Sequence, residues 1–356
     1  MIEDTKDASN HLLERVRDAL NTGNPLAIMG GNTKRFLGRS VAAARVLTPL
    51  LVGEHRGIVH YDPTELVLTA RAGTPLSDIE AALAERGQML ACEPPHFGPQ
   101  PTFGGMVAAG ISGPRRPWSG AVRDLVLGCR LIDGRARHLR FGGEVMKNVA
   151  GYDVSRLMAG SFGCLGVLTE VSMKVMPKPG HRRTLRIDVD AAQALRHMDN
   201  WAREPAPISA SYHDGTALYV RLEGGSGSVQ AWSHKIGGGD ADEAIWDDLR
   251  EHRLPFFDSA GPLWRLSVPR ATPSLKLEGD VLIDWAGCQR WLRTEADGAT
   301  IRRIVHGVGG HAIAYRGQTD EPFHPLSAPL LALHQRLKSQ FDPQGLFNPG
   351  RLYGSL

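Results

Sequence analysis

The segment MKNVAGYDVSRLMAGSFGCLGVLTEV, residues 146–171, decides which fold the chain can adopt. It places glycines at three-residue intervals, at Gly160, Gly163 and Gly166, and then enters a stretch of alternating side chains that starts at Val167. Such alternation is typical of a β-strand. Because glycine has no Cβ, a backbone this rich in glycine can approach a ligand closely. The segment therefore predicts a ligand, such as a nucleotide, that is held mainly by main-chain groups.

The composition is that of an ordinary soluble protein. A length of 356 residues predicts two domains, or one domain with a large insertion. Apolar residues make up 42% and charged residues 22%, which is enough to build a soluble core. The net charge of +3 is too small, and the basic residues are too scattered, to indicate a nucleic-acid partner.

The cysteines and the hydropathy exclude further classes. Cys92, Cys129, Cys164 and Cys288 lie far apart and no C-x-x-C occurs, so we expect neither an iron–sulfur cluster nor a metal site in this chain. Reduced thiols are typical of cytoplasmic proteins. No apolar run approaches the ~20 residues of a membrane helix, and no secretory signal is visible. We expect a cytoplasmic chain without direct membrane insertion, which partners could attach to the inner face of a membrane.

Two more glycine-rich turns lie upstream. The strand Leu26–Met29 feeds the first turn, Gly30-Gly31-Asn32-Thr33-Lys34, in which converging N–H groups, a hydroxyl and a lysine could bind an anion. The second turn is Thr102-Phe103-Gly104-Gly105-Met106, and it continues through Gly110, Ser112 and Gly113. Neither the Walker A motif nor the G-x-G-x-x-G fingerprint occurs, which disfavours the usual ATP and nicotinamide sites. Three turns suit a long cofactor with a central pyrophosphate, and the residues alone do not name it.

The residue composition and the pattern of predicted elements change near residue 181. Residues 1–180 carry the glycine turns and predict a cofactor-binding domain. Residues 181–325 hold six of the seven tryptophans and alternate strand-like with helical stretches, which predicts a separate α+β domain with a roughly duplicated β-α-β rhythm. Residues 326–356 predict a helix followed by a turn-rich tail that is either mobile or a specific plug.

Taken in order, these motifs resemble the FAD-binding family of p-cresol methylhydroxylase and vanillyl-alcohol oxidase. The resemblance implies an α+β fold with a two-subdomain PCMH-type FAD-binding domain at 1–180, a smaller ferredoxin-like cap at 181–325 and a C-terminal segment at 326–356 that returns to the flavin. The matching segments are 30–33, Asp62-Pro63, 72–76, 102–106, Arg123-Asp124, Lys147-Asn148-x-x-Gly151-Tyr152-Asp153, 160–167 and Asn348-Pro349-Gly350.

Within this family the chain resembles the smaller flavoprotein subunits of glycolate oxidase (glycolate dehydrogenase), through residues 93–98, 112–116 and 261–269. This resemblance implies two partners, a larger FAD-binding subunit and an iron–sulfur subunit. Together they oxidise a small 2-hydroxy acid, glycolate, to the 2-oxo acid and pass the electrons onward.

The resemblance also assigns cofactor contacts residue by residue. The first and second turns hold the two sides of the diphosphate, and residues 112 and 113 line the ribityl–phosphate path. The glycine triplet contacts the adenosine, and the C-terminal tail approaches the flavin ring. The first loop lacks the histidine of covalent members, so the FAD is expected to be non-covalent. The residues concerned are Gly30, Gly31, Asn32, Thr33, Lys34, Thr102, Gly104, Gly105, Met106, Ser112, Gly113, Asp124, Gly163, Gly166, Val167 and Asn348.

Several residues keep a structural interpretation beside the functional one. Lys34 either touches phosphate or is a solvated surface residue, and Asp124 either touches the cofactor or acts as a cap. Arg265 could anchor a substrate carboxylate in a bidentate manner, although a structural salt bridge is favoured. His306 and His311 are similar to a histidine cluster of related dehydrogenases that often holds a metal, but two ordinary histidines beside a glycine turn are favoured. The catalytic residues therefore stay unassigned.

Three functions follow from the sequence. The first is a flavin-containing subunit of a 2-hydroxy-acid-oxidising complex, either catalytic or relaying electrons. The second is a non-catalytic scaffold that keeps FAD for stability. The third is an unrelated reductase on the same fold, of the pyridine-nucleotide-dependent enolpyruvyl type. Bleaching of the flavin by glycolate or D-lactate would exclude the pure scaffold, and rapid reduction by NADPH would favour the third.

Overall fold

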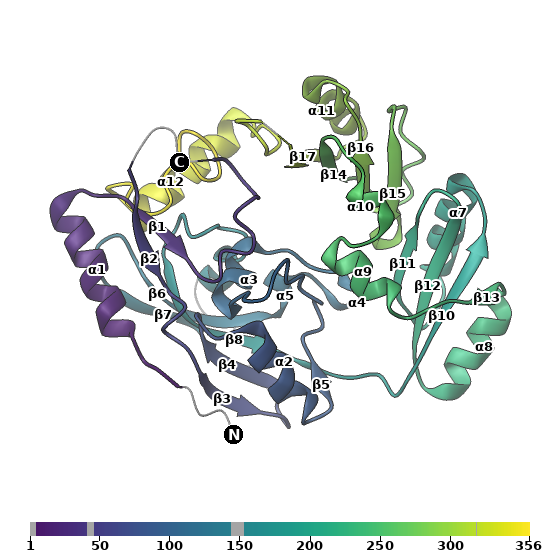
Figure 1. The fold of residues 1–356 in the computed structure, drawn as a ribbon, viewed down its shortest axis with the longest axis horizontal. Helices are drawn as coiled ribbons and strands as arrows, with labels where there is room; N and C mark the ends of the chain where they lie inside the picture. Colours follow the sequence, from purple (N-terminus) through teal and green to yellow (C-terminus); the bar gives the residue numbers. More distant parts are fainter. Residues whose placement is uncertain (1–4, 41–45, 144–152, 318) are drawn as a thin grey trace. The chain divides into compact units, whose positions relative to one another are not determined.

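The structure is a computed structural model, and it describes residues 5–40, 46–143, 153–317 and 319–356. The chain forms two compact units (Figure 1). Unit 1 comprises Met1–Ile111, Ala121–Pro177 and Pro325–Leu356, and unit 2 comprises Ser112–Gly120 and Lys178–His324. Residues 147–152 of the Lys147-to-Asp153 motif lie outside the described residues, whereas Asp153 accepts a hydrogen bond from the Arg156 N–H as the N-cap of a short helix.

The centre of unit 1 is a five-stranded antiparallel sheet in the order β3-β4-β8-β6-β7. Its middle strand, β8, is the one that follows the glycine triplet. The alternating pattern predicted this strand, and both its faces are covered, since only Glu170 and Lys174 are not fully buried. The strands are β3 (Ile58–Asp62), β4 (Val67–Arg71), β6 (Val126–Ile132), β7 (His138–Gly142) and β8 (Val167–Lys174).

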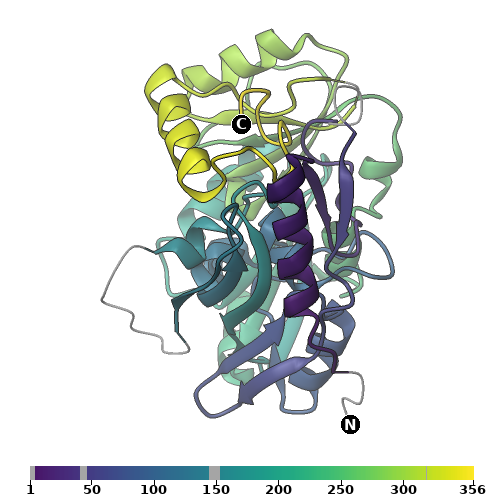
Figure 2. The same cartoon turned by 90° about the vertical axis from the view of Figure 1, so that its left-hand side faces the viewer.

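A second layer of unit 1 carries the first glycine turn. Strand β1 (Leu26–Met29) pairs in parallel with β2 (Thr48–Leu51). Helix α1 (Ser9–Thr22) buries one apolar stripe in the same core, and Gly23 ends it in the left-handed conformation at φ 71°. Figure 2 views the molecule from the side on which α1 lies. The remaining elements are α2 (Leu76–Ala84), β5 (Gln88–Met89), α3 (Phe103–Ala109), α5 (Val122–Leu125), α6 (Val154–Leu157) and β9 (Met176–Pro177).

The C-terminal tail is an integral part of unit 1. After helix α12 (Ala328–Phe341), Phe347 pairs in parallel with Leu26 of β1. The buried ammonium of Lys338 donates hydrogen bonds to the Asp342 carboxylate (2.7 Å) and to the carbonyls of Cys164 and Phe347 (2.8 Å each). Of the two sequence interpretations of the tail, the described contacts favour the specific plug over the mobile end.

Unit 2 contains, among the described residues, an eight-stranded sheet in the order β13-β10-β12-β11-β15-β16-β14-β17. Each half runs 4-1-3-2 in strand order, which is the ferredoxin-like arrangement, and the halves meet where His213 of β11 pairs with Ile283 of β15. The two halves therefore repeat the strand order, although no described helix of the second half corresponds to α7 between β14 and β15. The first half is β10 (His181–Asp188), α7 (Ala191–Trp201), β11 (Ile208–His213), β12 (Ala217–Gly224), α8 (Ser226–Ile236) and β13 (Gly239–Asp240). The second half is β14 (Leu263–Ser267), β15 (Asp280–Asp284), η1 (Trp285–Gly287), β16 (Gln289–Arg293), α11 (Gly298–Gly307) and β17 (His311–Arg316).

Helices α7, α8 and α11 pack on one face of this sheet, whereas Trp246 of α9 packs on Tyr212 and Arg221 of the other face. Apolar residues of α7 and α8 share a core with Val220 and Leu222 of β12, and α11 shares one with Leu266 of β14. Since successive side chains of a strand point to opposite faces, Arg221, Glu223 and Arg265 lie on the other face. The short helices α4 (Arg116–Ser119), α9 (Ile245–Glu251) and α10 (Pro255–Asp258) also belong to unit 2.

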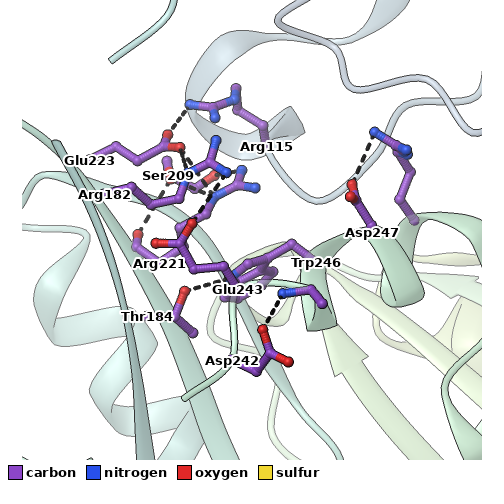
Figure 3. Close-up of polar contacts among 12 residues, drawn as sticks. Arg115, Arg182, Thr184, Ser209, Arg221, Glu223, Asp242, Glu243, Trp246 and Asp247 are labelled. Carbon is purple, nitrogen blue, oxygen red and sulfur yellow. Dashed lines mark hydrogen bonds and ion pairs between the residues drawn. The ribbon is translucent and has the colours of Figure 1, made fainter. Parts of the chain in front are cut away.

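An arginine-rich network ties the segment Ser112–Gly120 to the sheet of unit 2 (Figure 3). The buried carboxylate of Glu223 forms ion pairs with Arg115, with Arg182 (2.7 Å) and with Arg221 (3.7 Å). Burial on its own raises the pKa of Glu223, but the hydrogen bond from Arg115 and the charges of Arg221 and Arg115 outweigh it and lower the pKa to about 2. The charged carboxylate is therefore strongly stabilised in the folded state.

The cysteines are not placed for chemistry. All four are free thiols, and burial raises the pKa of Cys92 and Cys129 to about 12 and that of Cys164 to about 11. Thiols with such pKa values are poor nucleophiles at neutral pH. Within the described ranges, no helix has both the length and the apolar character needed to span a bilayer.

We predict that Glu223→Gln lowers the free energy of unfolding of unit 2 by about 3 kcal/mol at neutral pH, because it removes the buried carboxylate that Arg115, Arg182 and Arg221 share. The folded pKa lies below the unfolded one, so the contribution of Glu223 is complete above pH 4.5 and is lost as the pH falls toward 2. The two proteins should therefore converge in stability at acid pH. Urea unfolding followed by tryptophan fluorescence measures this in unit 2 alone, which holds all seven tryptophans.

The matched control is Asp240→Asn, which removes the exposed partner of Arg183 on the same sheet. It should cost much less than Glu223→Gln, because water and salt screen an exposed ion pair. Equal losses for the two variants, or a Glu223→Gln deficit that persists unchanged at low pH, would contradict the assignment.

Candidate cofactor site

The first and second glycine turns meet within unit 1 at the C-terminal end of β1. A Cβ on Gly30 would lie 2.1 Å from the Thr102 hydroxyl oxygen, and one on Gly31 would lie 1.5 Å from the Gln100 carbonyl oxygen. Real Cβ atoms do not approach other atoms so closely. The two glycines are therefore required by the contact between the turns themselves, before any ligand is considered.

The first turn presents donors that the protein does not use. Among the described residues, none accepts a hydrogen bond from the N–H of Gly30, Gly31, Asn32 or Thr33. Asn32 has a φ of 56°, so the turn alternates between right- and left-handed backbone as anion-binding nests do. Main-chain donors converging in this way fit the diphosphate of a dinucleotide.

The second turn is organised differently. Thr102 is the N-cap of α3, and its hydroxyl accepts from the Gly105 N–H at 3.2 Å. The N–H groups of Phe103, Gly104 and Met106 donate to carbonyls of Thr74, Ala72 and Thr102. Met106 itself is buried in the core. This turn can therefore offer a ligand a hydroxyl and a flat backbone surface rather than a set of spare N–H donors.

The third glycine segment reaches the same place through the tail. The side-chain carbonyl of Asn348 accepts from the Ile28 N–H (2.8 Å), and its amide nitrogen donates to the Phe162 carbonyl (2.7 Å). A Cβ on Gly163, whose φ is 72°, would lie 2.8 Å from that nitrogen. Asn348 thus bridges β1 and the glycine triplet. In the described residues the N–H groups of Gly163 and Gly166 have no acceptor, while Val167 is buried and pairs with Ile132.

Positive charge gathers beside the first turn. Lys34 is half-buried, donates to the Thr33 hydroxyl (3.3 Å) and the His96 carbonyl (3.2 Å), and lies over the Phe97 ring at 5.7 Å. It is therefore not a freely solvated side chain. Arg351 of the tail donates to the carbonyls of Arg39 and Arg35, and burial lowers its pKa. In the described parts of the chain no carboxylate pairs with Arg351, so its charge is available to an anion.

Strained backbone is also found at these turns. Asn32, Phe97, Phe162 and Asn348 all have a positive φ, between 39° and 56°. Such conformations are costly for residues other than glycine, by roughly 1–3 kcal/mol, and they gather at ligand sites. Spare donors, excess positive charge and strained turns together make this region of unit 1 suitable for a cofactor with a pyrophosphate.

Three of the sequence-predicted positions, Ser112, Gly113 and Asp124, have structural contacts of their own, and their role toward the cofactor stays a prediction. Ser112 and Gly113 group with unit 2, where the Gly113 carbonyl accepts a hydrogen bond from the Trp285 indole at 3.0 Å. The Asp124 carboxylate accepts from the Ala121 N–H at 2.8 Å, which makes it a cap of α5. The sequence reasoning missed two residues that shape the site, Gln100 and Arg351, because neither belongs to a glycine motif.

The histidines of unit 2 form no metal centre among the residues described. His306 lies near the end of α11 and His311 begins β17, with Gly309 between them at a φ of 79°. Both rings approach His324, at 5.9 and 6.4 Å between centroids. No group of three potential ligands that could hold a metal ion is present in the described ranges.

A family model described as "FAD binding domain" matches residues 7–142. The chain is 55% identical to glycolate oxidase subunit GlcE of Escherichia coli K12, over 98% of this chain and 99% of that protein. It is 32% identical to glycolate oxidase subunit GlcD of Bacillus subtilis 168, over 48% of this chain and 37% of that protein. A solved alkyldihydroxyacetonephosphate synthase superposes on 96% of this chain and 75% of its own, with a TM-score of 0.67 and 17% identity, a likeness of fold alone.

We predict that Gly30→Ala lowers flavin affinity roughly tenfold or more, because its Cβ must displace Thr102 and open the contact between the two turns. Titration of the purified protein with FAD, followed by flavin fluorescence, measures the effect. Gly53→Ala is the control, since its Cβ would meet nothing within 4 Å. If Gly30→Ala is folded and retains the affinity of the unmodified chain, the turns do not form the site.

Proposed function

The chain belongs to the PCMH-type FAD-binding flavoprotein family that includes glycolate oxidase subunit GlcE, and from this premise we propose that it is the FAD-binding subunit of a glycolate-oxidising complex. Family membership confirms the resemblance drawn from the glycine motifs. The cofactor is FAD, and the chain is an FAD-dependent oxidoreductase. The identity of 55% over nearly the whole of both chains is the observation that carries the proposal.

The residues of unit 1 fit the cofactor. We assign the spare N–H groups of Gly30, Gly31, Asn32 and Thr33 to the diphosphate, with Lys34 supplying positive charge beside it. The Thr102 hydroxyl and the surface of Gly104 and Gly105 border the other side, and the N–H groups of Gly163 and Gly166 face the adenosine. When bound, the flavin supplies a hydride acceptor, which no amino-acid side chain provides.

The protein contributes position rather than covalent chemistry in this scheme. Asn32 and Thr33 stand in the first turn, and neither side chain is a nucleophile suited to a flavin linkage. Asn348 uses both ends of its amide on the backbone of Ile28 and Phe162, so its role is to hold β1 against the glycine triplet. The FAD is therefore proposed to be bound without a covalent bond.

The substrate of the complex is proposed to be glycolate, which is oxidised to glyoxylate while electrons pass to a partner. The partners proposed are a larger FAD-binding subunit and an iron–sulfur subunit. The chain itself has no C-x-x-C motif for a cluster of its own. A cytoplasmic location, with any attachment to the inner membrane face made through these partners, belongs to the same proposal.

A scaffold is the second candidate. It is favoured by one observation: the histidines of unit 2 do not gather into a metal-ligand group among the described residues. In that case the flavin would stabilise the chain and the oxidation would take place on another subunit. The two candidates differ in whether the flavin of this chain changes redox state.

We predict that anaerobic glycolate bleaches the visible flavin band of this chain in the assembled complex, and that acid precipitation releases all FAD and leaves a colourless pellet. The informative variant is Gly31→Ala, whose Cβ would lie 1.5 Å from the Gln100 carbonyl oxygen and should exclude FAD from this subunit. A complex that assembles with this variant should lose electron transfer from glycolate to an artificial acceptor.

Full activity of the assembled Gly31→Ala complex, with no flavin on this chain, would establish the scaffold instead. A yellow acid pellet would contradict non-covalent binding.

A further inference from the structure

Arg265 occupies the face of the unit 2 sheet that lies opposite α7, α8 and α11. It lies in the middle of β14, opposite Trp291 of β16 and Ile313 of β17. Its chain neighbours Trp264 and Leu266 point the other way, into the core formed with α11. The guanidinium therefore extends from a strand that is paired on both sides, onto the face where Phe257 of α10 packs against Trp291.

No acid neutralises this arginine in the described residues. Its Nε is buried and makes no hydrogen bond, and the ionisable groups that act on its guanidinium are Tyr315 and Arg116 rather than a carboxylate. The structural salt bridge favoured by the sequence is thus absent. Buried polar groups of native proteins nearly always have a partner, and an arginine without one is a candidate ligand-binding group.

A second arginine, Arg116, lies close to the same tryptophan ring as Arg265. The guanidinium of Arg116 lies over the Trp285 ring at 4.2 Å, and that of Arg265 lies 5.9 Å from the centroid of the same ring. Burial lowers the pKa of His311, and the charges of Arg265 and Arg116 lower it further. Burial also lowers the pKa of Arg265, and Arg116 again contributes. A negative charge bound beside these groups would raise the pKa of both Arg265 and His311.

Trp285 is held firmly as the aromatic wall of this region. Its indole N–H donates to the Gly113 carbonyl, and its backbone N–H donates to the Asp284 carboxylate at 2.6 Å. Asp284 also accepts from the Gln289 side chain at 3.0 Å. Trp285 and Ala286 both have a φ of 52°, a conformation that is costly for bulky side chains and is retained where the surroundings over-determine it.

We propose that Arg265, with Arg116 and the ring of Trp285, forms a binding site in unit 2 for the carboxylate of a small organic acid. The planar fork of a guanidinium pairs with a carboxylate through two parallel hydrogen bonds. The Trp285 ring, which lies beside both guanidinium groups, suits the carbon end of such a molecule. The choice of glycolate and glyoxylate as ligands rests on the proposed function, whereas the anion site itself does not.

The test is equilibrium binding to the full-length, FAD-loaded chain, measured by calorimetry and by ligand-observed NMR. Glycolate and glyoxylate should bind, whereas glycolamide, the neutral amide of glycolate, should not. Arg265→Gln should weaken binding about 10- to 100-fold, the value of a charge-assisted hydrogen-bonded contact. The matched control is Arg302→Gln, which removes an arginine stacked on Trp264 at 5.3 Å, on the opposite face of the sheet, and should leave affinity unchanged.

A second readout needs no variant. Binding of the anion should raise the pKa of His311, measured by NMR titration of its ring protons in the unmodified chain. An unchanged pKa at saturating glycolate, equal binding of glycolamide, or equal affinity of Arg265→Gln would each overturn the proposal. Inorganic phosphate competing as well as the organic acids would show an unselective anion site and would overturn the carboxylate assignment.

Failure of this site and failure of the proposed function can be told apart. Arg265→Gln should keep its full FAD content, because Arg265 belongs to unit 2 and the cofactor turns belong to unit 1. A chain that binds glycolate through Arg265 but takes up no FAD would remove the proposed function alone. A chain that carries FAD and oxidises glycolate in the complex, with Arg265→Gln indistinguishable from the unmodified protein, would remove the carboxylate site alone.

Discussion

The architecture of unit 1 depends on the side-chain amide of Asn348. Its carbonyl can only accept from the Ile28 N–H, and its amide nitrogen can only donate to the Phe162 carbonyl, so the orientation of the amide is fixed by its two partners. Segments separated by most of the chain are thereby held at hydrogen-bond distance. The tail thereby joins the strand that feeds the first glycine turn to the glycine triplet before β8.

The tail can play this part because a buried ion pair holds it. Lys338 and Asp342 satisfy each other, and their remaining hydrogen-bonding capacity is directed to the backbone. Lys338 donates to the carbonyls of Cys164 and Phe347, and Asp342 accepts from the N–H groups of Leu346 and Phe347. A buried pair with all its partners in place contributes more to a specific geometry than to stability. Here that geometry fixes the backbone of Phe347, the residue directly before Asn348.

The sequence predicted the parts of this arrangement that depend on local pattern. Glycine spacing indicated all three turns, alternation indicated β8, and the order of the motifs indicated the family. Pairings between distant residues could not be read in this way. Gln100 has no motif, and its importance comes from a carbonyl oxygen that leaves no space beside Gly31. The repeat in unit 2 lies in the order of the strands, so the residue patterns indicated only that strands and helices alternate there. The sequence favoured a salt bridge for Arg265, because a sequence does not show which carboxylates lie near an arginine in space.

The central claim is that the dinucleotide is bound by glycine turns that Asn348 holds together. The FAD affinity of the Asn348→Asp variant tests this claim most directly. The aspartate can still accept from the Ile28 N–H, but it has no N–H to donate to Phe162 and sets a negative charge against that carbonyl. The account predicts a folded protein, judged by its circular dichroism, whose FAD affinity is at least about tenfold weaker. An Asn348→Asp chain that binds FAD as tightly as the unmodified protein would contradict the account.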